Sequence, residues 1–335
     1  MSFWIDVLSG TPQGSVLAPI LFLILIYDMP DLVDHFCKLF ADDSKLIGVI
    51  KNSLDRDLLQ QDIDKLCKWS NDWSMSFNED KCKTMVIKTA SSNKILDNDF
   101  SYTMLRQDGS RFELNETTQE RDLGIQINNK LKWNSQVDYA VSKGFSSLGT
   151  LKRTFLYWNS SMFTKLYTTY VRPHLEYCSA AWNPHLKKDI FKLESVQRAA
   201  TKLVPEIRFL DYNSRLSILG LQKLSDRRTR GDLIQFYKIE NNFNILKWHR
   251  INSPMASLSA TGHAVSLRES KHRLIRQFTK VEARNQFLSN RIVPNWNKLP
   301  DCITESTSTN QFKNRLDNFQ CKAISSSRST IVGPR

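Results

Sequence analysis

The sequence has few of the features that mark secreted or zinc-stabilised proteins. Its 335 residues include six cysteines, and no two of them form a CxxC pair or stand near histidines at a zinc-site spacing. This scatter argues against a zinc site and a disulfide framework, and it suits a reducing compartment. The cysteines are Cys37, Cys67, Cys82, Cys178, Cys302 and Cys321.

The sequence also lacks a signal peptide and an apolar run of membrane length. Met1 is not followed by a basic segment and a small-residue cleavage site. The apolar run Val16–Tyr27 has 12 residues and contains Pro19, whereas a membrane-spanning helix needs about 20. We therefore interpret this run as a fully buried core helix, and we expect an intracellular protein, cytoplasmic or nuclear.

Acidic residues are scarce in the second part of the chain. Residues 1–134 carry 15 Lys and Arg against 20 Asp and Glu, a net charge of −5, whereas residues 135–335 carry 32 against 14, a net charge of +18. A basic excess of this size suits a polyanion partner, most simply nucleic acid. A solubilising surface is the alternative, and charge alone leaves both open.

Residues 1–134 show the patterns of mixed strands and helices. Two short apolar segments around an acidic connection in "FCKLFADDSKLIGVI" predict a β-hairpin. An amphipathic helix follows, and "RDLGIQINNKLKW" predicts a further hairpin with an Asn-Asn turn. The apolar face of the helix comprises Leu59, Ile63, Leu66, Trp69 and Trp73.

From about residue 135 the apolar spacing becomes helical. One predicted stripe comprises Val137, Val141, Phe145, Leu148, Leu151 and Phe155, and another comprises Ile190, Leu193, Val196, Ala200 and Leu203. The second helix carries Lys187, Lys188, Lys192, Arg198 and Lys202 on its opposite face. We expect a basic helical region over 135–251, a linker over 252–270, a helical segment over 271–322 and a disordered tail over 323–335.

Two adjacent acids, Asp42 and Asp43, stand in the connection of the first predicted hairpin. Hard cations prefer carboxylate oxygens, and Mg²⁺ usually takes one or two of them together with substrate phosphates. In two-metal phosphoryl transfer such carboxylates hold ions about 4 Å apart. The alternative is an exposed turn that merely contains two acids, as turns often do.

A turn that opens a helix, "GTPQGSVLAP", precedes this hairpin, and such a turn lets backbone approach a flat or anionic ligand closely. Together, "SGTPQGSVLAPILFLILIYDMP" and "LFADD" resemble motifs B and C of the reverse transcriptase palm, specifically in jockey-like non-LTR (LINE) retrotransposons. "WSNDWSMSFNEDKCKTMVI" resembles motif D, and "RDLGIQINNKLKW" resembles the primer-grip turn. Segments of the basic half, such as "KLESVQRAATKLV" and "LSDRRTRGDLIQFYKI", extend the resemblance over nearly the whole chain.

The resemblance implies an α+β fold. Residues 1–134 would form a partial palm with an antiparallel sheet and helices, and a mostly helical thumb and basic C-terminal region would follow. The implied activity is RNA-directed DNA polymerisation. It would use an RNA template, a DNA primer, deoxynucleoside triphosphates and Mg²⁺.

The resemblance also implies roles for individual residues. Asp42 would be the principal metal ligand, with Asp43 beside it, and Lys81 would lie near the triphosphate and could protonate the leaving pyrophosphate. Without the resemblance, Lys81 is simply one lysine of a solvated turn. The implied substrate-binding residues are Pro12, Gln13, Gly14, Ser15, Phe40 and Ala41, and the implied primer grip is Leu123 and Gly124.

Five basic residues are candidate nucleic-acid contacts. Arg227, Arg228 and Arg230, near Phe236 and Tyr237, have the composition for phosphate contact and base stacking. The alternative is a solvated basic helix face whose aromatic side chains pack in the core. Lys187 and Lys188 complete the predicted set.

The resemblance further implies an incomplete metal site. Motif A, which carries another metal-binding aspartate, precedes motif B by several tens of residues, and this chain begins about a dozen residues before Gln13. Asp6 is the only upstream acid, and we assign it no ligand role. We therefore expect an N-terminally truncated polymerase that is inactive alone. The alternatives are a non-catalytic nucleic-acid-binding remnant of a retrotransposon polyprotein and a decayed reading frame without selected function.

Overall fold

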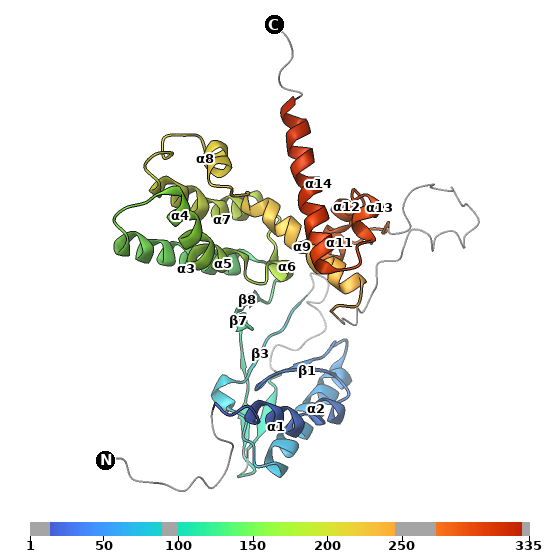
Figure 1. The fold of residues 1–335 in the computed structure, drawn as a ribbon. Coiled ribbons are helices and arrows are strands. Elements are labelled where there is room, and N and C mark those ends of the chain that lie inside the picture. Colours follow the sequence, from blue (N-terminus) through green and yellow to red (C-terminus); the bar gives the residue numbers. More distant parts are fainter. Residues whose placement is uncertain (1–13, 89–99, 107, 245–272, 330–335) are drawn as a thin grey trace, which may run out of the picture. The chain divides into compact units, whose positions relative to one another are not determined.

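The computed structural model describes residues 14–88, 100–106, 108–244 and 273–329, of which residues 321–329 are described by their backbone alone. The chain folds into two compact units, unit 1 (Met1–Glu120) and unit 2 (Arg121–Arg335) (Figure 1). Residues 252–270, the expected linker, lie outside the described residues, as do residues 330–335 of the expected tail. Residues 323–329, for which the sequence predicts a disordered tail, continue a helix.

Unit 1 mixes helices with short strands, as an α+β fold does. Its elements are α1 (Ala18–Leu25), η1 (Met29–Leu32), β1 (Phe36–Phe40), β2 (Asp43–Ile47), α2 (Ser53–Asp72), η2 (Glu79–Lys81), β3 (Lys83–Thr84), β4 (Thr103–Leu105), β5 (Arg111–Glu113) and β6 (Asn115–Glu116). β7 (Gln119–Asp122) crosses into unit 2. β1–β2 and β4–β5 are antiparallel pairs, whereas β3–β6 is parallel, so separate two-stranded sheets replace the expected antiparallel sheet.

The amphipathic helix α2 forms where the apolar spacing predicts it. A capping box starts it: the Asn52 side chain accepts a hydrogen bond from the Asp55 amide at 2.9 Å, and Asp55 accepts one from the Asn52 amide. Leu66 and Trp69 enter a core with Ile26 and Met29. The helix therefore lies against the segment that leads into β1.

The apolar helix α1 departs from the sequence prediction. None of its residues is buried, and Ile24, for example, is 67% exposed. Among residues 14–30, only Ile26 and Met29 are buried, and both lie just beyond the end of α1. The interpretation of Val16–Tyr27 as a fully buried helix is therefore wrong in this structure.

In its described residues, unit 2 is helical apart from the end of β7, β8 (Ile125–Asn128) and the loops between elements. Its first helices are α3 (Asn134–Thr154), α4 (Ser160–Leu166), the π-helical turn η3 (Tyr167–Val171), α5 (Arg172–Glu176), α6 (Ser179–Trp182), α7 (Lys187–Ala200), η4 (Thr201–Leu203), α8 (Tyr212–Ile218) and α9 (Leu224–Glu240). α10 (Glu282–Asn285), α11 (Leu288–Arg291), α12 (Val293–Trp296), α13 (Asp301–Thr304) and α14 (Thr309–Ser329) follow.

The first core of unit 2 lies between α3, α5 and α7. Most residues of the two predicted stripes, on α3 and α7, pack in it, but Phe145 is 41% exposed. Val137, Leu193 and Val196 are fully buried in it. Gly144 allows close packing there, because a Cβ at this position would lie 3.0 Å from Leu175 Cδ2.

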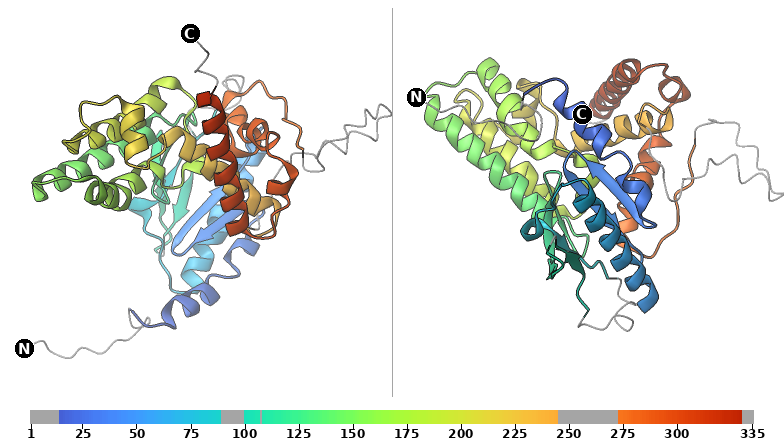
Figure 2. Two further views of the ribbon diagram at one scale, coloured as in Figure 1. Left: turned by 45° about the horizontal axis from the view of Figure 1, so that its top comes forward. Right: turned by 90° about the horizontal axis from the view of Figure 1, so that it is seen from below.

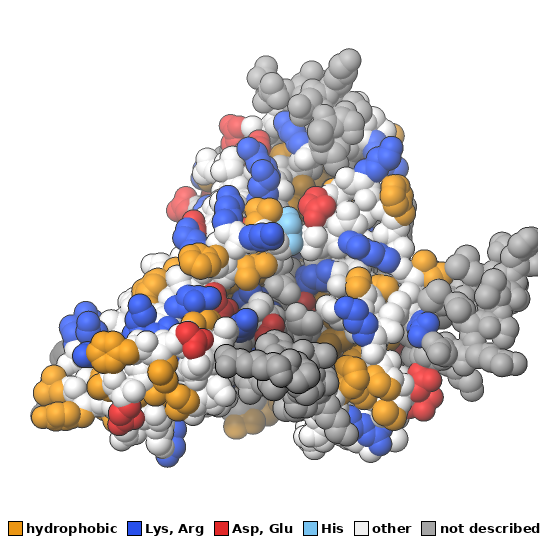
Figure 3. Space-filling view, turned by 90° about the horizontal axis from the view of Figure 1, so that it is seen from above, with side chains coloured by type: hydrophobic (Ala, Val, Ile, Leu, Met, Phe, Trp, Pro, Cys, Tyr) orange, Lys and Arg blue, Asp and Glu red, His pale blue; other side chains and the backbone are white. Residues whose placement is uncertain are grey.

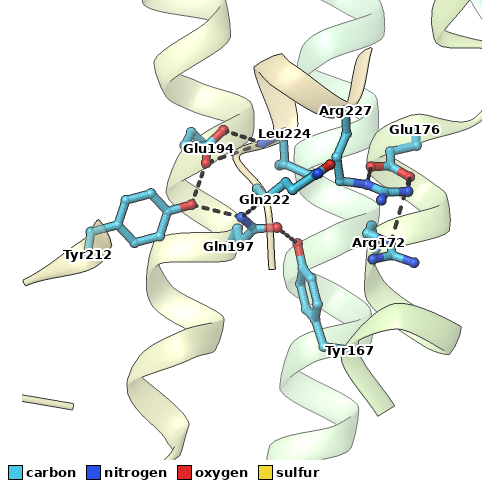
Figure 4. A network of polar contacts seen from close by, with 9 residues as sticks. All are labelled: Tyr167, Arg172, Glu176, Glu194, Gln197, Tyr212, Gln222, Leu224 and Arg227. Atoms are coloured by element: carbon cyan, nitrogen blue, oxygen red, sulfur yellow. Dashed lines mark hydrogen bonds and ion pairs between the residues drawn. The ribbon is translucent and has the colours of Figure 1, made fainter. Parts of the chain in front are cut away.

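A buried polar network crosses this core (Figure 4). Gln197 accepts a hydrogen bond from the Tyr167 hydroxyl at 2.6 Å and donates to the Tyr212 hydroxyl at 2.9 Å. Tyr212 in turn donates to Glu194. Burial, together with the Glu194 carboxylate, raises the pKa of Tyr212. The network thus fixes α7 against η3 and α8.

The second core of unit 2 surrounds the end of α9. Tyr237 stacks on Phe312 of α14, with ring centroids 4.2 Å apart, and Trp296 of α12 packs beside them. The Arg230 guanidinium donates to both carboxylate oxygens of Asp317, at 2.6 and 2.8 Å, and joins α9 to α14. Figure 2 shows these two helices in further views.

None of the helices in the described ranges is long and apolar enough to cross a membrane. The cysteines that the structure describes, Cys37, Cys67, Cys82, Cys178 and Cys302, are all free thiols.

Candidate active site and nucleic-acid contacts

The acidic pair stands at the tip of the β1–β2 hairpin. Phe40 pairs with Asp43 in the ladder, so Ala41 and Asp42 form a two-residue loop. Such loops need a positive φ at their first position, which Gly usually supplies, and Ala41 adopts it at +51°. For a residue with a Cβ this conformation costs about 1–2 kcal/mol. A strained residue therefore sets the position of both acids.

Both carboxylates of the pair are accessible. Asp42 and Asp43 are exposed, and no hydrogen bond or ion pair to another described residue occupies either of them. Two adjacent carboxylates without a cationic partner suit a hard divalent cation. No group of three or more His, Cys, Asp and Glu side chains that could hold a metal occurs among the described residues. The pair therefore has suitable chemistry but supplies only part of a ligand set.

A buried carboxylate on α2 anchors the start of β1. Asp62 Oδ2 accepts hydrogen bonds from the backbone amides of Asp34 and His35, both at 2.9 Å, and lies 2.8 Å from His35 Nδ1. Lys65 donates to Asp62 Oδ1 at 2.7 Å. Burial would raise the pKa of Asp62, but these hydrogen bonds outweigh burial and lower it.

The loop before α1 lies partly within the described residues. Pro12 and Gln13 lie outside them. Gly14 has a φ of +83°, and a Cβ at this position would meet no other atom within 4 Å. Its neighbour Ser15 accepts a hydrogen bond from the Ala18 amide at 3.1 Å. Ser15 therefore binds the amide of the first residue of α1, whereas Leu17, at the N-cap, provides no side-chain cap.

Lys81 is exposed at the end of η2, which the Asn78 side chain caps by accepting a hydrogen bond from the Lys81 amide at 3.3 Å. No hydrogen bond or ion pair joins Lys81 to Asp42 or Asp43. A cavity of about 300 Å³ beside η2 is lined by Ser70, Phe77, Glu79 and Arg106 among others, and by none of the predicted catalytic residues.

The predicted primer-grip residues form the turn of the β7–β8 hairpin. Leu123 and Gly124 both have positive φ, +45° and +84°, as the favoured two-residue hairpin turn requires. The Tyr177 hydroxyl donates to the Leu123 carbonyl at 3.1 Å, and its ring lies 3.2 Å from where a Cβ of Gly124 would be. The hairpin therefore does not turn at the predicted Asn-Asn pair; Asn128 ends β8, and a separate turn follows in which the Leu131 amide donates to the Asn128 carbonyl at 2.9 Å.

Two of the three candidate arginines in "DRRTR" bind carboxylates within the protein. Arg227 binds Glu176 through two nitrogens (Figure 4), and Arg230 binds Asp317. Arg228 is 2% exposed and donates to Asn183 Oδ1 at 3.1 Å. In this conformation Arg228 presents no guanidinium to a phosphate, and a phosphate would have to compete with carboxylates for the other two.

Lys187 and Lys188 are exposed at the start of α7. Figure 3 shows a face on which Lys and Arg side chains outnumber Asp and Glu and lie beside exposed hydrophobic ones. Among the predicted nucleic-acid contacts, Lys187 and Lys188 are the exposed side chains, whereas Arg228 is buried and Arg227 and Arg230 bind carboxylates.

Sequence reasoning missed Asp62 and Tyr177. Asp62 interrupts an apolar stripe on α2, four residues before Leu66. A charged residue at a core-facing position is a usable signal of a buried polar anchor. Tyr177 carries no such signal, because its partners lie over fifty positions earlier in the chain.

Part of the chain is similar in sequence to a known protein family. Residues 4–143 match the family model described as reverse transcriptase (RNA-dependent DNA polymerase). This segment contains the Asp42–Asp43 hairpin and the Leu123–Gly124 turn. This segment is thus similar in sequence to reverse transcriptases.

Two curated proteins extend the comparison. The RNA-directed DNA polymerase from mobile element jockey of Drosophila melanogaster is 32% identical over 83 residues, which are 22% of this chain and 9% of that protein. An uncharacterised protein of Caenorhabditis elegans is 27% identical over 121 residues, 35% of this chain and 61% of that protein. The chain thus spans less than two thirds of each. No solved structure matches significantly.

Proposed function

We propose that this chain is part of the RNA-directed DNA polymerase of a jockey-like non-LTR retrotransposon. Unit 1 would contribute part of the palm, and the helices of unit 2 would contribute the thumb and a basic nucleic-acid-binding region. The observation that carries the proposal is the strained two-residue hairpin that presents Asp42 and Asp43 within the segment that matches the reverse transcriptase family.

Asp42 and Asp43 would hold Mg²⁺ in this function. Bound Mg²⁺ would polarise the attacking hydroxyl and neutralise charge on the leaving pyrophosphate. Phe40 and Ala41 would support the primer terminus, while Pro12, Gln13, Gly14 and Ser15 would line the template base and the incoming nucleotide. Lys81 could donate a proton to pyrophosphate, and the Leu123–Gly124 turn would hold the primer.

Two carboxylates make only part of a two-ion site. A complete two-ion site would need a further carboxylate, and no group of three potential ligands occurs among the described residues. We propose that the isolated chain does not extend a primer on an RNA template with Mg²⁺. Robust extension that Asp42→Ala abolishes would overturn this part of the proposal.

The metal-binding role can be tested without polymerase activity. Fe²⁺ placed in the site, with added hydrogen peroxide as oxidant and ascorbate to reduce Fe³⁺ again, would generate hydroxyl radicals that cleave the backbone near residues 41–43, and mass spectrometry would locate the cleavage. Asp42→Asn with Asp43→Asn should abolish it. The control is Asp57→Asn with Asp72→Asn, two exposed acids of α2, which should leave it unchanged. Cleavage that both double variants leave intact would contradict the assignment.

A second candidate function is nucleic-acid binding without catalysis. The net charge of +18 on residues 135–335 and the exposed Lys187 and Lys188 favour it. Phosphate-dominated affinity falls steeply with salt, so filter binding of RNA at two salt concentrations would test it. An affinity that does not change with salt would count against it.

A further inference from the structure

The charged side chains of α7 are sorted by sign. Its two acids, Asp189 and Glu194, are buried. Glu194 accepts hydrogen bonds from the Tyr212 hydroxyl and from the Leu224 amide, the latter at 3.1 Å. The outward face of α7 and η4 carries Lys187, Lys188, Phe191, Lys192, Ser195, Arg198 and Lys202. Among these only Lys192 is paired with an acid, Asp138. This face is therefore basic without compensating acids of its own helix.

A series of cation–ring contacts leads from Arg198 of this face to the buried Arg215 of α8. The guanidinium of Arg198 lies 4.0 Å from the ring centroid of Tyr212 and 5.9 Å from that of Phe191. The guanidinium of Arg215 lies 5.7 Å from the same Tyr212 ring. The Nε atoms of Arg198 and Arg215 are buried and have no hydrogen-bond partner among the described residues. Aromatic rings therefore contribute to the placement of both cations.

The series of contacts ends at an exposed aromatic ring. Arg215 donates to the backbone carbonyl of Arg208 at 3.4 Å, and the Arg208 guanidinium lies 4.5 Å from the ring centroid of Phe209. Phe209 is 83% exposed, and Phe191, at the other end of the series, is 64% exposed. Two exposed rings, each with an arginine near it, thus lie at the ends of a series of contacts whose middle members, Tyr212 and Arg215, are buried.

Few acids oppose this surface. Glu206 and Asp211 are the exposed acids in the loop between η4 and α8. Asp211 accepts hydrogen bonds from the amides of Asn213 and Ser214, at 2.9 and 3.2 Å, and so caps α8. The charge of the surface therefore matches a polyanion rather than a basic or neutral partner.

We propose that this surface, the α7–α8 tract, binds single-stranded nucleic acid. We define the tract as Lys188, Phe191, Arg198, Lys202, Arg208 and Phe209. Its cations contact phosphates, and bases stack on Phe191 and Phe209. Stacking on an exposed ring requires unpaired bases, which a duplex does not offer. The inference rests on the nucleic-acid-binding part of the proposed function and needs no metal site.

Fluorescence anisotropy of the full chain with a labelled RNA strand and with a duplex of equal length, both in EDTA, tests the tract. Phe209→Ala should weaken binding of the single strand about fivefold or more, because it removes one stacked base, and should leave duplex binding unchanged. Tyr157→Ala is the matched control, since Tyr157 is 88% exposed in the loop between α3 and α4, outside the tract. The Tyr157→Ala variant should change neither the affinity for the single strand nor the affinity for the duplex.

The charged residues have a different readout. Lys202→Ala and Arg208→Ala should each reduce the slope of log K against log salt concentration by about 0.7, the value for one lost phosphate contact on a single strand. Lys152→Ala, an exposed lysine of α3, should leave the slope unchanged.

Three outcomes would overturn the proposal: equal effects of Phe209→Ala and Tyr157→Ala, tighter binding of the duplex than of the single strand, or complete competition by polyglutamate at matched charge. Because EDTA removes any polymerase activity, loss of the metal site would leave these results unaffected. Failure of the tract and failure of the polymerase assignment are therefore distinguishable.

Discussion

His35 and Asp62 form the contact that joins α2 to the start of β1, with His35 Nδ1 2.8 Å from Asp62 Oδ2. The same oxygen accepts hydrogen bonds from the backbone amides of Asp34 and His35. Asp62 has no exposed surface. Since β1 leads directly to Asp42 and Asp43, this one carboxylate fixes the strand that presents them. It positions the hairpin without touching any reacting group.

We expect Asp62→Asn to destabilise unit 1 by about 3 kcal/mol, because a buried acceptor of several hydrogen bonds loses its charge. Urea unfolding followed by hydrogen–deuterium exchange of peptides from 14–88 would measure the loss. Asp34→Asn is the control: Asp34 also binds Lys65, at 2.8 Å, but its side chain is 83% exposed. Such a surface pair contributes about 1 kcal/mol or less. Equal losses in the two variants would contradict the anchoring role.

The same carboxylate predicts an acid dependence. The pKa of Asp62 is lowered in the folded state, so ionised Asp62 stabilises the fold. Its contribution is complete above the ordinary aspartate pKa of about 3.9 and is lost as the pH falls through the lower folded-state pKa. The stability difference between wild type and Asp62→Asn should therefore shrink below about pH 4. Unfolding curves at several acidic pH values would test this, and a constant difference would argue against it.

Local patterns predicted the local structure well. Two short apolar segments around an acidic connection predicted the β1–β2 hairpin, and helical stripes predicted α2, α3 and α7. The exposure of α1 was not predictable from its apolar run, because the burial of a helix depends on which other element covers it. The second hairpin turns at Leu123–Gly124 rather than at the Asn-Asn pair, since Leu123 adopts a positive φ that its residue type does not favour.

The candidate site was predictable only where its residues are neighbours in sequence. Asp42 and Asp43 share one turn, so the sequence reveals them directly. The partners of Arg227 and Arg230 are 51 and 87 positions away, so their ion pairs could not be foreseen from the run of arginines. The same holds for the series from Phe191 to Phe209, which depends on the packing of Tyr212 between two arginines.

Gly124 offers a test of the contact between Tyr177 and the β7–β8 turn. Gly124 and Gly109 have nearly equal φ values, +84° and +82°, but only Gly124 has a ring against it. Gly109→Ala should therefore cost the conformational term alone, about 1–2 kcal/mol. Gly124→Ala should cost more, and the excess should disappear when Tyr177→Ala is combined with it. Thermal unfolding of the four variants completes the cycle, and an excess that persists without Tyr177 would assign it to another cause.

Arg291 and Asp232 form a buried ion pair that joins α11 to α9. Arg291 donates to both carboxylate oxygens, at 2.9 and 2.8 Å, and also to the Ala180 carbonyl of α6. We expect Arg291→Met to cost about 3–5 kcal/mol, because it leaves a buried charge unpaired. Arg291→Lys should rescue little of this, since lysine lacks the planar fork. Urea midpoints would measure both, and full rescue by lysine would show that charge alone suffices.

The network around Gln197 predicts an alkaline dependence. Burial raises the pKa values of Tyr167 and Tyr212, and the Glu194 carboxylate adds to the effect at Tyr212. The neutral phenols therefore stabilise the fold fully below the ordinary tyrosine pKa of about 10, and stability falls as the pH rises above it. Tyr212→Phe, although destabilising at neutral pH through the lost hydrogen bonds, should make this fall shallower. Unfolding followed by tyrosinate absorbance would show both effects, and an unchanged slope in Tyr212→Phe would mean that this phenol ionises in the folded protein.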